Sequence, residues 1–261
     1  MENQLLDSDM LNKDEGKSLS ALLSNGYQTQ SVEYIKKGFE IFKQNIGGFI
    51  GFLIVVGIAS SIINAIPFVK VIGMALLAPA IAGFYIVAKM IDKNEVHSFS
   101  NFFDGTKNYM PLFIVSIIPT LIIGVVMLVV GGWAYFKMSF LGIQPKINFY
   151  DLGSLSAIST ATGLGARAGL AGLIAFVITI LFIFSTFLVL FERFEPMKAI
   201  DISRQIIAKK FFNWVGFMFL LALFNMLGAI CLLVGLLVTV PTSICAIYVA
   251  YEDVVGLNLR D

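Results

Sequence analysis

Residues 214–251, WVGFMFLLALFNMLGAICLLVGLLVTVPTSICAIYVAY, run for 38 residues without a charged side chain. As one helix this stretch would be about 57 Å long, whereas about 20 apolar residues are enough to cross the roughly 30 Å of hydrocarbon in a bilayer. The stretch therefore predicts two membrane-crossing helices that are joined near Gly235.

A second long apolar block, residues 46–88, divides in the same way. Its only charge is Lys70, which lies close to Pro67 near the middle of the block. A lone lysine at mid-bilayer is costly and proline breaks helices, so we expect Asn64, Pro67 and Lys70 to lie in an interfacial turn. The alternative is a pair of re-entrant half-helices.

The composition of the whole chain indicates the same class of protein. Hydrophobic residues make up 58% of the 261 residues, charged residues make up 13%, and the mean hydropathy is +0.87. Soluble domains carry nearer a quarter charged residues. The sequence thus predicts an all-α polytopic membrane helical bundle, with six transmembrane helices arranged as three hairpins. The expected spans are residues 46–66, 71–90, 111–136, 168–190, 214–233 and 236–251.

Positive charges indicate the side of the membrane that each loop faces. Of the 18 Lys and Arg residues, 14 fall on one side of the predicted spans, and cytoplasmic loops carry the excess of these residues. We therefore expect both termini in the cytoplasm. Residues 1–30 lack a long apolar run, so we expect them to form a mobile cytoplasmic tail. We expect residues 31–256 to form a single transmembrane domain and residues 257–261 to form a cytoplasmic C-terminus.

Two pairs of spans align with each other. Placing Pro79 on Pro241 aligns GMALLAP at residues 73–79 with GLLVTVP at residues 235–241, and placing Asn45 on Asn213 aligns the starts of the first and fifth spans. These alignments predict an internal repeat.

A polar segment with spaced apolar residues precedes the first, third and fifth spans, and these segments end at Asn45, Asn108 and Asn213. In the first copy, apolar residues recur at helical spacing from residue 31, while Glu and Lys occupy the other face. That pattern is typical of an amphipathic helix lying along the cytoplasmic leaflet. In the second copy, Gly105 weakens a continuous helix. We therefore expect a unit that occurs three times and consists of an interfacial helix followed by a hairpin. The alternative is that these helices are ordinary membrane-surface anchors.

The lead segment YIKKGFEIFKQN at residues 34–45 and the closing segment from 235 to 253 resemble those of a broad set of uncharacterised prokaryotic multi-pass inner-membrane proteins. These segments are also similar to the membrane domain attached to some glycerophosphodiester phosphodiesterases. The resemblance covers about residues 31–256 and implies that the spans lie in the inner membrane of a prokaryotic cell. It does not extend to the soluble catalytic domain of those enzymes, so it implies no activity here.

Few residues have the chemistry of a catalytic or metal site. The single histidine, His97, lies in a loop, and the sequence supplies no set of ligands around it, so we interpret it as solvated. Cys231 and Cys245 lie in apolar stretches, where a thiol behaves as a small hydrophobe. The net charge of +1 excludes a large basic surface for nucleic acid. We expect no enzymatic activity and no cofactor.

The remaining candidate sites are of two kinds. Pro79, Pro119 and Pro241 lie within spans and free backbone carbonyls, so they are candidate kinks lining a cavity, together with Asn225. Polar residues within spans more often bond to neighbouring helices than line a solute path.

A candidate cytoplasmic charged cluster, Glu192, Arg193 and Glu195, follows the fourth span. A structural role at the level of the lipid headgroups is the favoured interpretation of it. The outer loop, residues 137–167, either covers an outer cavity, meets a partner protein, or is mobile.

Two functions from different classes follow from these features. The favoured one is a non-enzymatic integral membrane protein, either a subunit of a membrane complex or a module that organises lipid or protein. The alternative is a transporter or permease for an apolar or amphipathic solute. The expected partners are membrane lipids, and either other membrane proteins or further copies of the chain.

Overall fold

The computed structural model describes Leu19, Leu22, Ser24 and residues 26–66, 69–132, 155–231 and 234–256. No strand occurs in these described residues. Six helical segments among them are long and apolar enough to cross a membrane, which confirms the predicted all-α polytopic helical bundle. The elements are α3 Ser31–Gln44, α4 Ile46–Ala65, α5 Val69–Asp92, η1 Phe99–Asn108, α6 Tyr109–Val129, α8 Leu155–Leu181, α9 Ser185–Leu190, α10 Pro196–Lys209, α11 Phe211–Ile230 and α12 Leu236–Val254.

The long helices pair as three hairpins, α4 with α5, α6 with α8, and α11 with α12. Both long apolar blocks divide as predicted, the first after Ala65 and the second after Ile230. Helices α4 and α5 have 20 and 24 residues, so each is long enough to cross a bilayer and neither has to be a re-entrant half-helix. Lys70 lies in the first turn of α5 rather than between the helices.

The outer loop is shorter than predicted. Helix α8 begins at Leu155, so residues 155–167 are helical and not part of a loop. Their Ser, Thr and Gly content has low helix propensity. A segment that continues a spanning helix nevertheless satisfies its backbone groups best as a helix. Residues 133–154, which hold the rest of the predicted loop and the end of the third predicted span, lie outside the described residues, as do 67–68 and 232–233.

The predicted tail is only partly described. Leu22 is buried, and the Trp214 indole nitrogen donates a hydrogen bond of 2.6 Å to the Tyr27 hydroxyl. That hydroxyl in turn donates to the Ile206 carbonyl oxygen at 2.8 Å. Burial raises the pKa of Tyr27 to about 12, so the hydroxyl keeps its proton at neutral pH. The chain just before α3 therefore packs on α10 and α11, while residues 1–18 and 257–261 lie outside the described residues.

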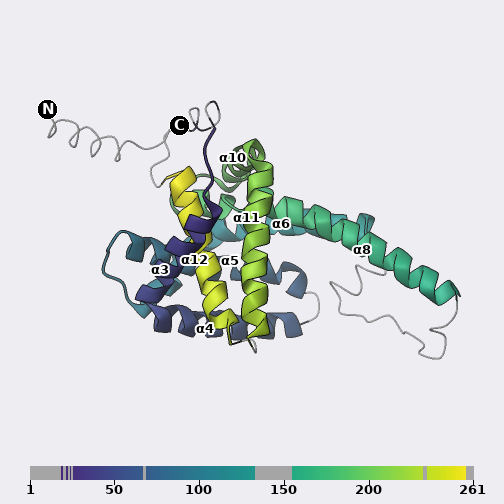
Figure 1. The fold of residues 1–261 in the computed structure, drawn as a ribbon, viewed down its shortest axis with the longest axis horizontal. Coiled ribbons are helices and arrows are strands. Elements are labelled where there is room, and N and C mark those ends of the chain that lie inside the picture. The colour runs from purple at the N-terminus through teal and green to yellow at the C-terminus, as the bar shows by residue number, and fades with distance from the viewer. Residues whose placement is uncertain are drawn as a thin grey trace.

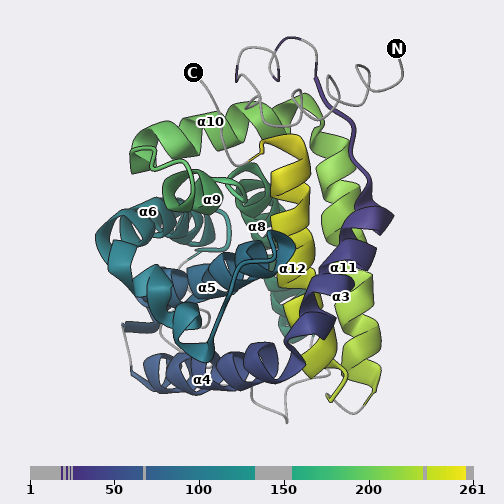
Figure 2. The ribbon, with the colours of Figure 1, turned by 90° about the vertical axis from the view of Figure 1, so that its left-hand side faces the viewer.

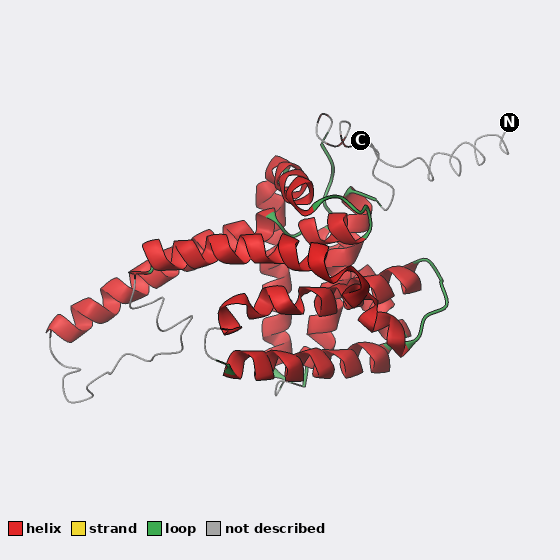
Figure 3. Cartoon of the chain, turned by 180° about the vertical axis from the view of Figure 1, so that it is seen from behind, coloured by secondary structure: helices red, strands yellow, loops and turns green. Residues whose placement is uncertain are grey.

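The three hairpins point in different directions. In both Figure 1 and Figure 2, α11 and α12 run up the page while α4 lies across it. The α6 and α8 pair projects to one side in Figure 1, and Figure 3 shows the same pair from behind. Because helices crossed in this way cannot all stand upright in one bilayer, several of the spans must be tilted.

Within each hairpin the second helix lies nearer the centre. In the most apolar 18 residues of each span, the buried share is 11% in α4 and 22% in α11, but 56% in α5 and 61% in α12. The outer helices α4, α6 and α11 instead expose large apolar side chains such as Ile58, Val125 and Phe219. These exposed faces are suited to lipid, because hydrocarbon imposes no cost on them.

The three lead segments α3, η1 and α10 pack in a cyclic order. Segment η1 packs on α5, and α10 packs on α9, so each of these two lies on the second half of the hairpin that precedes it in the chain. The first lead helix, α3, has no preceding hairpin and packs on α12 of the last one. Figure 2 shows α3 crossing α12 and α10 lying beside α9. A threefold repeat predicts this order, although the repeat itself stays a prediction.

Two of these crossings are made through glycine. A Cβ atom on Gly38 of α3 would lie 2.6 Å from the Ala246 nitrogen and 2.9 Å from the Thr242 carbonyl oxygen of α12. A Cβ atom on Gly105 of η1 would lie still closer to the Pro79 carbonyl oxygen of α5. Gly105 therefore does not interrupt the second lead segment, which continues through it as a 3-10 helix and uses it as the contact point.

We expect Gly38→Ala to lower the free energy of unfolding by about 1–3 kcal/mol, because the added methyl group would force α3 away from the α12 backbone. The control is Gly47→Ala in α4, where an added Cβ meets nothing within 4 Å. Thermal unfolding in mild detergent measures both variants. Equal midpoints for the two variants would contradict the close crossing.

Candidate functional site

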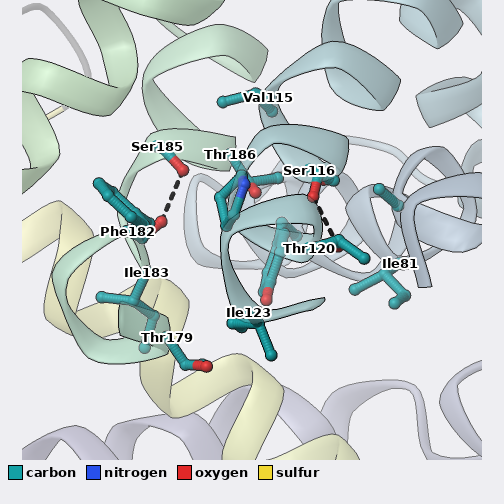
Figure 4. A pocket seen from close by; sticks show the side chains of 13 residues that line it. Ile81, Val115, Ser116, Thr120, Ile123, Thr179, Phe182, Ile183, Ser185 and Thr186 are labelled. Carbon is teal, nitrogen blue, oxygen red and sulfur yellow. Dashed lines mark hydrogen bonds between the residues drawn. The ribbon is translucent and has the colours of Figure 1, made fainter. Parts of the chain in front are cut away.

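A cleft of about 460 Å³ lies between α5, α6 and the junction of α8 and α9. We call it the α5–α6–α9 cleft. Its wall is mainly apolar, with hydroxyl groups from five serines and threonines (Figure 4). The lining residues are Ala78, Ile81, Tyr85, Val115, Ser116, Pro119, Thr120, Ile123, Thr179, Phe182, Ile183, Ser185 and Thr186.

The cleft adjoins a break in the fourth span. The span is present as predicted, but residues 182–184 form a turn between α8 and α9. Ser203 of α10, which is fully buried, joins the two sides of the turn. Its hydroxyl donates to the Leu181 carbonyl oxygen at 2.8 Å and accepts from the Phe184 nitrogen at 3.2 Å. Irregular backbone at membrane depth requires such partners, because hydrocarbon offers none.

Three of the five serine and threonine hydroxyls in the cleft are already bonded to nearby backbone carbonyls, those of Thr120, Thr179 and Ser185. Thr120 donates to the Ser116 carbonyl oxygen at 2.8 Å, and Ser185 donates to the Phe182 carbonyl oxygen at 2.6 Å (Figure 4). These bonds satisfy the donors and leave oxygen lone pairs as acceptors in the wall. The Tyr85 hydroxyl makes no hydrogen bond with any other described residue, while its ring lies 4.2 Å from the Phe187 ring centroid. The wall therefore suits an amphipathic molecule better than an ion.

The structure separates the predicted cavity residues. Pro119 lines the cleft, whereas Pro79 abuts η1 and Pro241 is buried in α12. Asn225 of α11 donates to the Leu221 carbonyl oxygen and to the Ser243 hydroxyl of α12, both at 2.8 Å. Asn225 thus joins α11 to α12 and does not line the cleft.

The predicted charged cluster forms the turn from α9 into α10. Glu195 directly precedes Pro196 at the first position of α10, and its carbonyl oxygen accepts from the Ala199 nitrogen at 2.9 Å. Arg193 has a φ of 57°, a left-handed conformation that is unusual for a residue with a Cβ. Glu192 lies near the Tyr251 hydroxyl of α12. These positions give the cluster contacts within the fold.

A different charged network, which the sequence pattern did not reveal, ties α3 to the ends of α5 and α12. Lys37 Nζ lies 3.0 Å from Asp92 Oδ1 and 3.6 Å from Glu252 Oε2. The Tyr34 hydroxyl donates to Asp253 Oδ2 at 2.6 Å. The available signal was the acidic residues that close the second and sixth spans. Glu252 also pairs with Lys93 Nζ, at 2.9 Å from its Oε1.

The electrostatics of this network follow from its partners. Although partial burial lowers the pKa of Lys37, the hydrogen bond and charge of Asp92 and the charge of Glu252 outweigh it, and the net pKa is raised. Burial and the neighbouring Asp253 carboxylate raise the pKa of Tyr34. Both groups therefore stay protonated at neutral pH and hold the carboxylates at the ends of α5 and α12.

No group of three or more His, Cys, Asp or Glu side chains suited to a metal occurs in the described residues. His97 Nδ1 lies 3.2 Å from the Glu95 carbonyl oxygen in an exposed loop. Comparisons of the chain with protein families, with curated proteins and with solved structures find no match. The six long apolar helices define the chain as a multi-pass integral membrane protein.

We expect Ser203→Ala to lower the free energy of unfolding by about 1–3 kcal/mol, because the Phe184 nitrogen and the Leu181 carbonyl oxygen would lose their partner at the break. The control is Ser61→Ala, where an exposed hydroxyl bonds only to its own helix. Hydrogen exchange at the Phe184 amide and thermal unfolding report the change. Unchanged protection of that amide would show that Ser203 does not hold the turn.

Proposed function

We propose that this membrane protein is a non-enzymatic module of a prokaryotic inner membrane that binds lipid or another amphipathic molecule in the α5–α6–α9 cleft. The main support for this proposal is the shape and lining of the cleft. The cleft has a volume of about 460 Å³, its wall is mostly apolar, and three of its hydroxyls are oriented by nearby backbone carbonyls. Ligand sites of this kind combine a large apolar surface with a few placed polar groups.

The orientation belongs to the same proposal. We place both termini in the cytoplasm, because the lead segments and the loops after the second and fourth spans carry most of the Lys and Arg residues. The ends of α5 and α12 meet α3 through Lys37, Asp92 and Glu252, which supports placing these three segments on one side of the membrane. Segments α3 and η1 then reach from that side to contacts part-way along two spans, at Thr242 and Ala246 of α12 and at Pro79 of α5.

Partners other than lipid remain predictions. Gly165 and Gly169 of α8 meet nothing within 4 Å where a Cβ would stand, so this row of small residues is open to a helix of another protein or of a second copy. The resemblance to the membrane domain attached to some glycerophosphodiester phosphodiesterases is likewise a proposal about ancestry.

A transporter or permease is the second candidate, and the break between α8 and α9 favours it. Transporters use interrupted helices at their substrate sites, because the freed backbone groups can face a solute. The cleft adjoins such an interruption. Movement of a labelled amphipathic molecule across proteoliposomes, faster than in protein-free vesicles, would favour this candidate over a binding module.

The test of the proposed function is binding of a monoacylglycerol with a fluorescent acyl chain to the purified protein in detergent. We expect Thr120→Trp to weaken this binding at least about tenfold, because the indole would fill the cleft. The matched control is Leu121→Trp on the same helix, where the side chain is 54% exposed and lies outside the cleft lining. Equal binding by the two variants would contradict the proposal.

A further inference from the structure

A second cavity, of about 320 Å³, lies beyond the α5–α6–α9 cleft toward the ends of α5 and α9. We call it the charged pocket. Its polar lining comprises two lysines, Lys89 and Lys107, two acidic residues, Glu95 and Asp104, and Asn108. Ile86, Met90, Leu190 and Phe191 complete its lining.

The two lysines of the charged pocket differ in their partners. Lys107 Nζ lies 2.7 Å from Asp104 Oδ1, and Asp104 also accepts a hydrogen bond from Asn101 at 2.8 Å. Lys89 Nζ, in contrast, makes no ion pair or hydrogen bond with any other described residue, and its recorded contact is with the Phe191 ring, 5.0 Å from the centroid. Among the described residues Lys89 is therefore a cation beside an apolar slot that forms no ion pair, although Glu95 lines the same pocket.

The cleft and the charged pocket lie in line along the same elements. On α5 the cleft is lined at residues 78–85 and the pocket at 86–90, and on α9 the cleft ends at Thr186 while the pocket begins at Leu190. On the third side, the end of η1, residues 104–108, lines the pocket and α6 lines the cleft from Val115 onward. Eight helical residues separate Ile81 from Lys89, which is about 12 Å along the helix.

We propose that the α5–α6–α9 cleft and the charged pocket bind one phospholipid, with its phosphate at Lys89 and an acyl chain along the cleft. The site has the order that such a molecule requires, a cation at one end and an apolar wall beyond it. The charged pocket also lies beside the loop after α5, which the positive charges assign to the cytoplasmic side, so the phosphate would lie in the cytoplasmic leaflet. This inference rests on the proposed function and adds the class of ligand.

An apolar groove between α3, α11 and α12 is the competing position for a lipid. Its volume is also about 460 Å³, and Lys36 lies at its edge. Lys36 Nζ is already paired with Glu33 Oε1 at 2.7 Å, and among the described residues Thr239 alone contributes a hydroxyl to the lining of this groove. The cation without a carboxylate partner thus distinguishes the charged pocket.

The experiment compares two fluorescent probes with the same acyl chain, a lysophosphatidylethanolamine and a monoacylglycerol, on the purified protein in detergent. We expect Lys89→Gln to weaken binding of the lysophospholipid about tenfold and to leave the monoacylglycerol unchanged, because only the phosphate uses the lysine. Lys89→Arg should keep the preference for the phosphate. The matched control is Lys43→Gln, which removes a lysine that lies 5.3 Å from the Phe39 ring centroid and lines neither cavity.

The outcomes separate the two proposals. The phosphate site is overturned if Lys89→Gln leaves lysophospholipid binding unchanged, or if Lys43→Gln weakens it equally. In either case, monoacylglycerol binding by the wild-type protein would still support the cleft as a lipid site. Failure of wild-type protein to bind either probe overturns the proposed function itself. Full displacement of the lysophospholipid by millimolar inorganic phosphate would show a site for free phosphate and would also overturn the inference.

Discussion

The close contact of the lead segments with the second helix of a preceding hairpin is the constraint on which the rest of the structure depends. At Gly38 and Gly105 no side chain separates the two backbones, so α3 approaches α12 and η1 approaches α5. Ordinary side chains would hold helix axes about 8–10 Å apart. The chain is thereby closed on itself, since α3 near its start packs against the last span.

This closure determines which helices form the centre. Helices α5, α9 and α12 meet through aromatic side chains: the Tyr85 ring lies 4.2 Å from Phe187, and the Phe187 ring stacks 4.7 Å from Tyr251. The outer helices α4, α6 and α11 are left to face lipid. The α5–α6–α9 cleft lies where an outer helix meets two central ones beside the turn at residues 182–184, so the break in the fourth span and the cleft are one feature.

The parts of this architecture that depend on chain length and apolarity were predictable from the sequence. The spans, their division near Gly235 and near Pro67, and the three hairpins follow from the length of hydrocarbon that a helix must cross. Long-range contacts were not predictable in this way. In the sequence, Ser203 is one polar residue of an amphipathic helix and Lys89 is one of many lysines near the ends of spans. Only the fold shows that Ser203 bonds to Leu181 and that Lys89 lies over the Phe191 ring. Of the candidate cavity residues only Pro119 lines the cleft, because proline in a span reports a local backbone change and not the place of a cavity.

The central claim is that the α5–α6–α9 cleft holds lipid in the membrane. It is tested most directly by placing the photo-crosslinking residue p-benzoylphenylalanine at Thr186, which lines the cleft, and at Ile58, which is 57% exposed on α4. Each protein is purified from its native membrane in mild detergent, irradiated and weighed by mass spectrometry. We expect a phospholipid adduct at position 186 and none at position 58, because detergent strips lipid from the outer surface first. No adduct at position 186, or equal adducts at both positions, would contradict it.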